Sequence, residues 1–555
     1  MASALEYLDG NPFKVAAYRK AAEAVMRLDR EAAELAREDL LPQVPGIGKA
    51  ISAKIRAWAI EEDFSDLSEV VSLLPKGFDE LLKVPGLGFK RIRTLQRERG
   101  IETVDDLLPA LKEGRLSGLR AFPRKFLEDL PPAIERVMGY RGKSTLDEAY
   151  EAAFSMGAKL ASLGVFSEVT GQCRRGGDVI DAVELLVQGD LRTLEGLASS
   201  LGSAQAFIRG DTLVIPSGLH HAPVVLHAAP PESRAAALLL STGSEDHVRA
   251  LGERAAALGV EVSGKGVFKG GSPVAVFGEE DLYGLLGLQY LPPEVREGRP
   301  SEMAFARGFS LPGLITLEDI RGTIHNHSTY SDGVCTLSGM ARAARDRGYR
   351  WIGISDHSRS ASYAGGLDVD ALEKQHREID ELNDSLGGIT ILKGIESDIL
   401  PDGSLDYPPE ILALFDFVVA SVHSGMEMDR KTMTRRIVKA LQNPFTSILG
   451  HPTGRLLLAR EPYAVDMDAV LEGALATGVA LEINANPIRL DLDWRLIEPF
   501  VGRGGIIALS PDAHTVGGLD DMRYGVMMGR KGFLTPGSCL NAWEVPEAVR
   551  FLGKK

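Results

Sequence analysis

The chain has 555 residues, 44% hydrophobic and 25% charged, a composition typical of globular proteins but a length too great for a single core. Because a typical domain has about 150 residues, we expect the chain to fold into three or four domains. No apolar run approaches the roughly 20 residues that cross a bilayer, the N-terminus lacks a signal-peptide pattern, and the three cysteines form no disulfide framework, so we expect a cytoplasmic protein without a membrane partner. The net charge of -15 ordinarily argues against binding of nucleic acid. Over residues 1–143, however, Lys and Arg roughly balance Asp and Glu, which allows a local basic surface there.

The N-terminal region, 1–143, carries an internal repeat and is predicted to be helical. The segments VPGIGKAISAKI (44–55) and VPGLGFKRIRTL (84–95) both place Val-Pro-Gly-x-Gly before an apolar helix studded with basic residues. Such glycines allow positive φ and a close approach to the backbone, and the first amides of the next helix favour an anion such as phosphate. A tight joint between two helices is the alternative role, but two copies favour phosphate binding. The candidate DNA contacts are Gly46, Gly48, Lys49, Lys54, Gly86, Gly88, Lys90 and Arg91.

This repeat resembles the helix-hairpin-helix motif, which implies DNA binding without sequence readout. Together with NPFKVAAYRKAAEAV (11–25), the first hairpin also resembles the small lyase domain of family X DNA polymerases. In that family a lysine after the first hairpin forms a Schiff base with an abasic sugar, and Lys54 falls at that place. A plain phosphate contact is the alternative role of Lys54, and the one we favour.

Residues 144–310 mix short apolar runs with helical stretches, which predicts an α+β domain. Three segments resemble the palm and thumb of family X polymerases: TGQCRRGGDVIDAVELLV (170–187), PPESRAAALLLSTGSEDHVRAL (230–251) and DLYGLLGLQYLPPEVREG (281–298). In that family the palm carries Gly-Ser-x-Arg-Arg and three aspartates that hold two magnesium ions for nucleotidyl transfer.

The chain departs from this pattern where metal would be held. Aligned on Arg174 and Arg175, the serine position and the three aspartate positions are occupied by Gln172, Ala182, Glu184 and Val225. One carboxylate cannot hold two divalent cations, so we expect an impaired palm retained as a scaffold or DNA clamp. Asp178 and Asp181 lie close by, but neither repeats the original spacing on the face of Glu184. A shifted but working polymerase site is the alternative.

From residue 320 to 555, apolar β-rich segments alternate with helical ones about seven times, and most of the β-rich segments end in a polar cluster. This alternation predicts a parallel α/β barrel with its site at the carboxyl ends of the strands. His325 and His327 alternate along a strand, so both side chains can reach one metal ion. We call the metal-binding types of residue at the ends of these segments the polar tips. They are His325, His327, Asp332, His357, Glu396, His423, His451, Asp512 and His514.

These tips fill the pattern H-x-H…D…H…E…H…H…D-x-H and so resemble the polymerase-and-histidinol-phosphatase (PHP) domain. The resemblance implies that all nine residues are metal ligands. It implies a first cation on His325, His327, Glu396 and Asp512, and a second that shares Glu396 with His423 and His451. A third would lie on Asp332, His357 and His514.

Imidazole with carboxylate suits manganese, zinc or iron, so we expect two or three divalent cations. Clustered cations activate water against a phosphodiester, which places Glu396 and Asp512 among the catalytic candidates. Arg455 and Arg489 follow strand tips and are candidates to grip phosphate, with a salt bridge on the rim as the alternative. Asp356 either orients a neighbouring ligand or caps a strand.

The order of hairpin module, palm and thumb, then PHP barrel resembles bacterial family X DNA polymerases over nearly the whole chain. The resemblance implies a metal-dependent 3'-to-5' exonuclease of the bacterial cytosol or nucleoid that acts in DNA repair, with abasic-site or 3'-end processing, on gapped, nicked or abasic DNA. Gap-filling polymerase activity is the main alternative. A small-molecule phosphatase does not account for two DNA-binding hairpins, and a non-catalytic DNA-binding scaffold does not account for a complete ligand set.

Overall fold

The computed structural model describes residues 1–26, 32–60, 64–201, 205–218 and 221–553. The chain forms two compact units, Met1–Arg141 and Gly142–Lys555. Within the described ranges no helix combines the length and the hydropathy that a membrane span requires.

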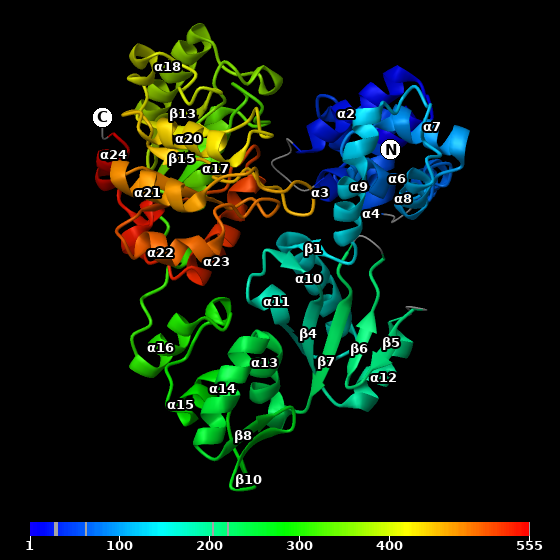
Figure 1. The fold of residues 1–555 in the computed structure, drawn as a ribbon, viewed down its shortest axis with the longest axis vertical. Helices are drawn as coiled ribbons and strands as arrows, with labels where there is room; N and C mark the ends of the chain where they lie inside the picture. The colour runs from blue at the N-terminus through cyan, green and yellow to red at the C-terminus, as the bar shows by residue number, and fades with distance from the viewer. Residues whose placement is uncertain (27–31, 61–63, 202–204, 219–220, 554–555) are drawn as a thin grey trace. The chain divides into compact units, whose positions relative to one another are not determined.

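The first unit is helical, as predicted. Its α-helices are α1 (Ala2–Tyr7), α2 (Pro12–Met26), α3 (Ala32–Arg37), α4 (Lys49–Ile60), α5 (Ser65–Val71), α6 (Phe78–Lys83), α7 (Phe89–Arg99), α8 (Val104–Lys112) and α9 (Arg124–Gly139) (Figure 1). Local signals set their ends: Gly100, at φ 65°, closes α7, and Thr103 with Asp106 forms a capping box that begins α8. The two Pro-Gly-x-Gly turns lead into α4 and α7.

The second unit begins with an α+β region. A five-stranded sheet has the order β2-β4-β7-β6-β5, in which only β4 and β7 are parallel, and a three-stranded antiparallel sheet follows (Figure 1). The elements are β1 (Ser144–Thr145), α10 (Leu146–Ser162), β2 (Ser167–Thr170), α11 (Gly171–Arg174), β3 (Val179–Ile180), β4 (Val183–Gln188), α12 (Leu191–Ser200), β5 (Phe207–Arg209), β6 (Thr212–Ile215), β7 (Val224–Ala229), α13 (Arg234–Thr242), α14 (Glu245–Ala257), β8 (Val260–Ser263), β9 (Gly266–Lys269), β10 (Ser272–Val274), α15 (Glu279–Leu285) and α16 (Pro300–Gly308).

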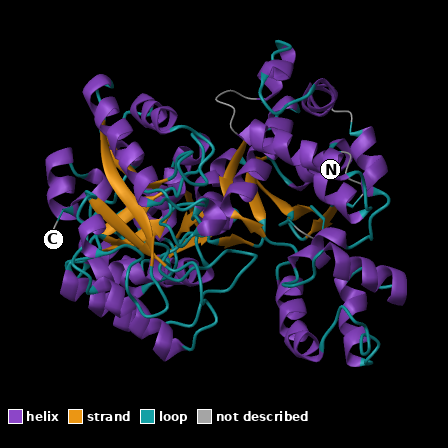
Figure 2. Cartoon of the chain, turned by 90° about the horizontal axis from the view of Figure 1, so that it is seen from above, coloured by secondary structure: helices purple, strands orange, loops and turns teal. Residues whose placement is uncertain are grey.

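The same unit ends in a barrel of seven parallel strands in sequential order, β11 to β17, which confirms the predicted fold. The residues at Asn326 and Ala513 bridge the last strand back to the first, and helices surround the strands (Figure 2). The elements are β11 (Gly322–Asn326), α17 (Leu337–Asp346), β12 (Trp351–Ile354), α18 (Val369–Ser385), β13 (Thr390–Asp398), α19 (Pro409–Leu412), β14 (Phe417–Ser421), α20 (Arg430–Leu441), β15 (Ile448–Leu449), α21 (Met467–Thr477), β16 (Ala480–Asn484), α22 (Ile497–Val501), β17 (Ile507–Ser510), α23 (Met522–Lys531) and α24 (Val545–Leu552).

Large aromatic side chains fill the barrel away from its polar end. Trp351 is fully buried, and a Cβ added at Gly322 would overlap its ring at 2.0 Å. Phe417 packs in the same way against Gly353 and Gly394. Glycine at these strand positions makes room for the rings. The apolar core therefore fills the barrel interior, while the polar side chains gather at the carboxyl ends of the strands.

Candidate metal centre

The predicted ligands come from different strands but meet at one mouth of the barrel. Because the strands are parallel, the residues at or just after their carboxyl ends lie around the same rim. Three of the ligands have left-handed backbone conformations: His325 at φ 58°, His451 at φ 24° and Asp512 at φ 52°. Such conformations cost non-glycine residues about 1 kcal/mol or more and concentrate at functional sites.

Glu396, on β13, lies at the centre of this cluster with 1% of its side chain exposed. Its Oε1 lies 3.2 Å from His325 Nε2, 3.2 Å from His423 Nε2 and 3.0 Å from His451 Nε2. Its Oε2 lies 2.9 Å from His357 Nδ1. One carboxylate therefore faces four imidazoles, which lie in or just after four different strands.

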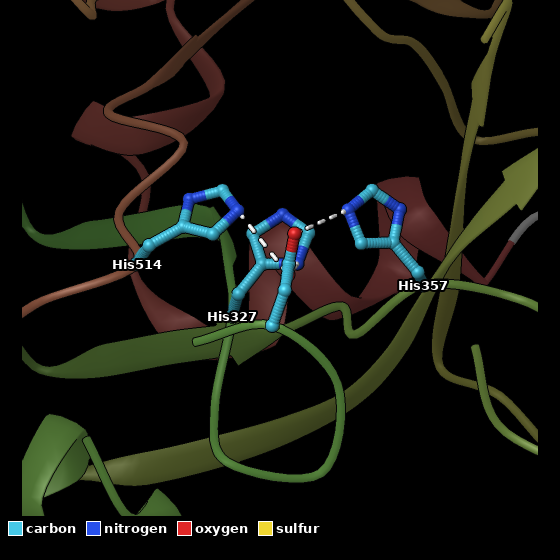
Figure 3. A group of neighbouring side chains, drawn as sticks. His327, His357 and His514 are labelled. Atoms are coloured by element: carbon cyan, nitrogen blue, oxygen red, sulfur yellow. Dashed lines mark ion pairs between the residues drawn. The ribbon is translucent and has the colours of Figure 1, made fainter. Parts of the chain in front are cut away.

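A second part of the cluster surrounds His327. The His327 and His514 rings stack with centroids 4.2 Å apart, and His357 lies across from them at 4.6 Å from His327 (Figure 3). Asp332 reaches between the outer two, with its carboxylate 3.3 Å from His514 Nε2 and 3.4 Å from His357 Nε2. Asp512 Oδ1 lies 3.2 Å from His327 Nε2.

Burial and the local charges shift the pKa values of these groups strongly. Burial lowers the pKa of His327 to about 3, and the nearby His514 adds to the effect. For His423, burial acts to lower the pKa, but Glu396 and Asp398 raise it to about 9. Burial opposes ionisation of Asp512, yet His325 and His327 hold its pKa well below the usual range. The carboxylates therefore draw positive charge into the site.

The residues present fit divalent cations. Among the described residues, several buried ring nitrogens lack a hydrogen-bond partner although carboxylate oxygens lie near them: His325 Nε2, His327 Nδ1 and Nε2, and His357 Nδ1. The side chains form four groups whose ligand atoms lie within 4.8 Å of one another: His327, Asp332, His357 and His514; His325, His327 and Asp512; His325, Glu396 and His451; and His357, Glu396 and His423. This grouping brings all nine predicted ligands together.

The grouping differs from the predicted partition among cations. His451 groups with His325, and His423 groups with His357, whereas the prediction joined His423 to His451. His327 also belongs to two groups. The place of His327 beside His514 has a geometric cause, because closure of the barrel brings β11 beside β17.

Three carboxylates lie behind the ligands, and two of them, Glu482 and Asp398, were not singled out in the sequence. Glu482, inside β16, meets His325 Nδ1 and accepts a hydrogen bond from the His451 amide. Asp398 lies 2.6 Å from His423 Nδ1. The signal for both is a carboxylate within a buried strand, where an acid needs a partner. Asp356 accepts hydrogen bonds from Ser328, Ser331 and Gln375, and so shapes the loop after β11.

The two predicted phosphate-gripping arginines occupy different places. Arg489 lies at the rim, with its Nε 3.5 Å from Asp512 Oδ2 and 18% of its side chain exposed. Arg455 lies behind it and donates hydrogen bonds to the backbone carbonyls of Arg489 and Leu490. Tyr363, in a short 3-10 turn (Ser362–Ala364), was not singled out in the sequence. Its ring lies 6.1 Å from His357 and 6.4 Å from His423 and is 70% exposed.

In the palm, the candidate polymerase carboxylates point to protein partners. Glu184, on β4, lies opposite Val225 of β7 and 3.0 Å from His227 Nε2. Asp181 accepts a hydrogen bond from Gln172, and Asp178 pairs with Arg455 of the barrel at 3.2 Å. Both arginines of the palm motif are likewise engaged, Arg174 with Glu279 and Arg175 with Glu297.

The two hairpins of the first unit share the same features. Gly46 and Gly86 have positive φ values of 100° and 80°, as tight turns require. At Gly48 and Gly88 an added Cβ would meet nothing within 4 Å, so the space above their backbone is open. Lys49 and Lys90 are exposed.

Two other predicted contacts in this unit already have protein partners. Lys54 pairs with Asp66. Arg91 donates to the carbonyls of Gly86 and Ala121, at 2.7 and 2.8 Å, and lies over the Phe126 ring. The prediction of Arg91 as a DNA contact therefore concerns a side chain that also holds its own hairpin together.

Comparison with known proteins assigns each region. The helix-hairpin-helix family model matches residues 1–63, the DNA polymerase beta thumb matches 237–297, and the PHP domain matches 323–486. The chain is 34% identical over 565 residues to the DNA polymerase/3'-5' exonuclease PolX of Bacillus subtilis, covering 99% of this chain and 96% of that protein.

Other similarities are partial. A probable phosphatase of Caldanaerobacter subterraneus is 30% identical over 171 residues, which are 29% of this chain and 60% of that protein. The polymerase beta of Leishmania infantum, in a ternary complex, overlaps 40% of this chain and 97% of its own, with 20% identity and a TM-score of 0.26. By its near full-length identity to the Bacillus protein, the chain belongs to the PolX family and combines family X polymerase modules with a PHP domain.

Proposed function

We propose that this protein is a divalent-metal-dependent DNA phosphoesterase that acts in DNA repair as a 3'-to-5' exonuclease and processes 3' ends and abasic sites. The observation that carries the proposal is the convergence of nine imidazole and carboxylate ligands at one barrel mouth. The chain also has two helix-hairpin-helix turns with open backbone above Gly48 and Gly88, which suit phosphates of gapped, nicked or abasic DNA.

The nine ligands would hold two or three cations, with manganese, zinc and iron all suited to the donor set. Such cations, when bound, supply a Lewis acid that activates water and offsets charge on the phosphoryl oxygens. Glu482 and Asp398 orient the rings of His325 and His423. Arg489, at the rim beside Asp512, is placed to hold a phosphate oxygen.

We propose further that the palm does not extend DNA and serves to hold DNA ends. Its three nearby acids, Glu184, Asp181 and Asp178, bond to His227, Gln172 and Arg455 respectively, so each has a protein partner of its own and they are poorly placed to share two cations. The alternative, a gap-filling polymerase with an associated exonuclease, is favoured by the name of the Bacillus relative, DNA polymerase/3'-5' exonuclease PolX. In the first unit, Lys49 and Lys90 would contact phosphates, while Lys54 retains either a phosphate or a lyase role.

One assay separates these functions. Purified protein with manganese is incubated with a 5'-labelled gapped duplex, with and without the four deoxynucleotides, beside a His325→Ala/His327→Ala variant. Shortening that the double variant abolishes, without extension, is the expected result. Extension that survives in the double variant would establish the polymerase alternative and overturn the proposal for the palm.

A further inference from the structure

A loop of the palm contacts the barrel next to the metal centre. This palm loop, residues 171–178, comprises α11 and the four residues after it. The Lys531 Nζ of α23 donates to the Arg175 carbonyl at 3.0 Å and also pairs with Glu297, although only 2% of the Lys531 side chain is exposed. Gly176, at φ 65°, packs so closely on α23 that an added Cβ would lie 3.1 Å from Met527.

The last residue of the palm loop, Asp178, is a largely buried acid that forms an ion pair with Arg455. Asp178 Oδ2 lies 3.2 Å from Arg455 Nη2, with 16% and 13% of the two side chains exposed. The other carboxylate oxygen, Oδ1, is buried and has no hydrogen-bond partner in the part of the chain that the structure describes. A buried carboxylate of this kind depends on its cation, so the pair holds both side chains in place.

Arg455 connects this pair to the rim of the site. Its Nε donates to the Arg489 carbonyl at 2.9 Å, and its Nη2 also donates to the Leu490 carbonyl. The guanidinium therefore fixes the backbone at the residue whose side chain lies 3.5 Å from Asp512. The guanidinium thus contacts two successive carbonyls and two carboxylates, Asp178 at 3.2 Å and Asp493 at 3.5 Å, which together define one orientation of the segment.

We propose that Asp178 is a positioning residue for the metal centre: through Arg455 it holds the backbone of Arg489, and so sets the guanidinium that grips the scissile phosphate. The inference rests on the proposed phosphodiester hydrolysis in the barrel. It assigns the palm loop a role in that reaction that does not require nucleotidyl transfer.

The test compares Asp178→Asn with Asp181→Asn in the full chain. Asp181 belongs to the same palm region but bonds to Gln172 and is 61% exposed, so it is a matched control. We expect Asp178→Asn to lower kcat/KM for removal of a 3' nucleotide about tenfold, with unchanged manganese content, and Asp181→Asn to change it less than twofold.

Coupling to Arg489 distinguishes positioning from a general loss of stability. Arg489→Ala should lower activity on its own, and Asp178→Asn added to Arg489→Ala should lower it by less than a further twofold, because the group being positioned is absent. A full tenfold loss in both backgrounds, or equal effects of the two aspartate variants, would overturn the proposal.

Amide hydrogen exchange tests the same link without activity. We expect the amides of residues 486–492 to exchange faster in Asp178→Asn than in the wild type, and at the wild-type rate in Asp181→Asn. If the wild type cleaves no DNA, the proposed function fails but this exchange result still decides whether Asp178 holds the segment. Unchanged exchange in Asp178→Asn would refute it.

Discussion

At the residue scale, carboxylates that point away from the cluster centre control how the imidazoles face it. A ring nitrogen that donates to Asp or Glu leaves the other nitrogen free to bind a cation, which fixes the tautomer. Asp398 holds His423 in this way at 2.6 Å, and Glu482 holds His325. These supports set ligand direction without entering the site.

Replacement of Asp398 should therefore weaken cation binding without unfolding the barrel. We expect Asp398→Asn to lower manganese affinity by roughly 10- to 100-fold, because the His423 ring loses the charged partner that orients it. Isothermal titration of the apoprotein measures the affinity. Asp402→Asn, on the exposed turn four residues later, is the control, and equal affinities in the two variants would contradict this role.

A different acid makes stability depend on pH. Burial, with Asp147 as the next cause, raises the pKa of Asp521 to about 7. The unfolded value is about 3.9, so the folded state binds this proton more tightly, and stability falls as pH rises from about 4 to about 7. Asp521→Asn should raise the free energy of unfolding at pH 8 by on the order of 2 kcal/mol, and the Tm with it. At pH 4 both should be nearly unchanged. Melting curves at the two pH values check this, and an equal gain at both would contradict it.

The meeting of the nine candidate ligands at one rim could be predicted from the sequence, because they lie in or after short β-rich runs and a parallel barrel brings such positions together. The grouping of these residues could not be predicted from the sequence, because it depends on how the sheet curves and closes between β17 and β11. The pairing of Arg455 with Asp178 could not be predicted either, because the two residues are 277 positions apart in the sequence.

At the scale of elements, glycine in the hairpins leaves the backbone open for the approach of a phosphate. Gly88 begins α7 at φ -79°, a conformation open to any residue, and an added Cβ there would touch nothing in the protein. Glycine is therefore not required by the fold at this position, which is consistent with close approach of a phosphate to the amides that open the helix.

Gly88→Ala should weaken DNA binding while the protein remains folded. We expect a several-fold higher Kd for duplex DNA by fluorescence anisotropy, with a Tm change within about 2 °C. Gly139→Ala, at the end of α9 with equally open surroundings, is the control. If both variants bind DNA as the wild type does, the hairpin does not approach the backbone phosphate.

The short turn that carries Tyr363 offers an aromatic surface beside the site. A terminal base stacked on this ring would contribute about 1–3 kcal/mol. Tyr363→Ala should raise KM for an ordinary 3' end roughly tenfold but leave KM for an end with an abasic 3' residue unchanged, and Tyr363→Phe should behave as the wild type. Equal losses on both ends would show that the ring does not stack on the base.

At the scale of the whole molecule, the three regions differ in how far their sequence patterns determine them. The helical hairpins and the barrel follow from local signals: glycine turns, capping residues and β-rich runs with polar ends. The palm depends on tertiary contacts, because its motif loop packs on α23 and its Arg174 and Arg175 reach acids more than 100 residues later. These contacts of the palm were therefore visible only in the structure.

The most direct test of the account is the rate of 3'-end hydrolysis by wild-type protein and Glu396→Gln across a manganese titration. Glu396 faces four imidazoles, so its loss should lower both bound manganese and the single-turnover rate, the latter by about 100-fold or more. Glu410→Gln, on the exposed start of α19, should match the wild type. A Glu396→Gln protein that trims DNA at the wild-type rate would contradict a barrel-centred nuclease.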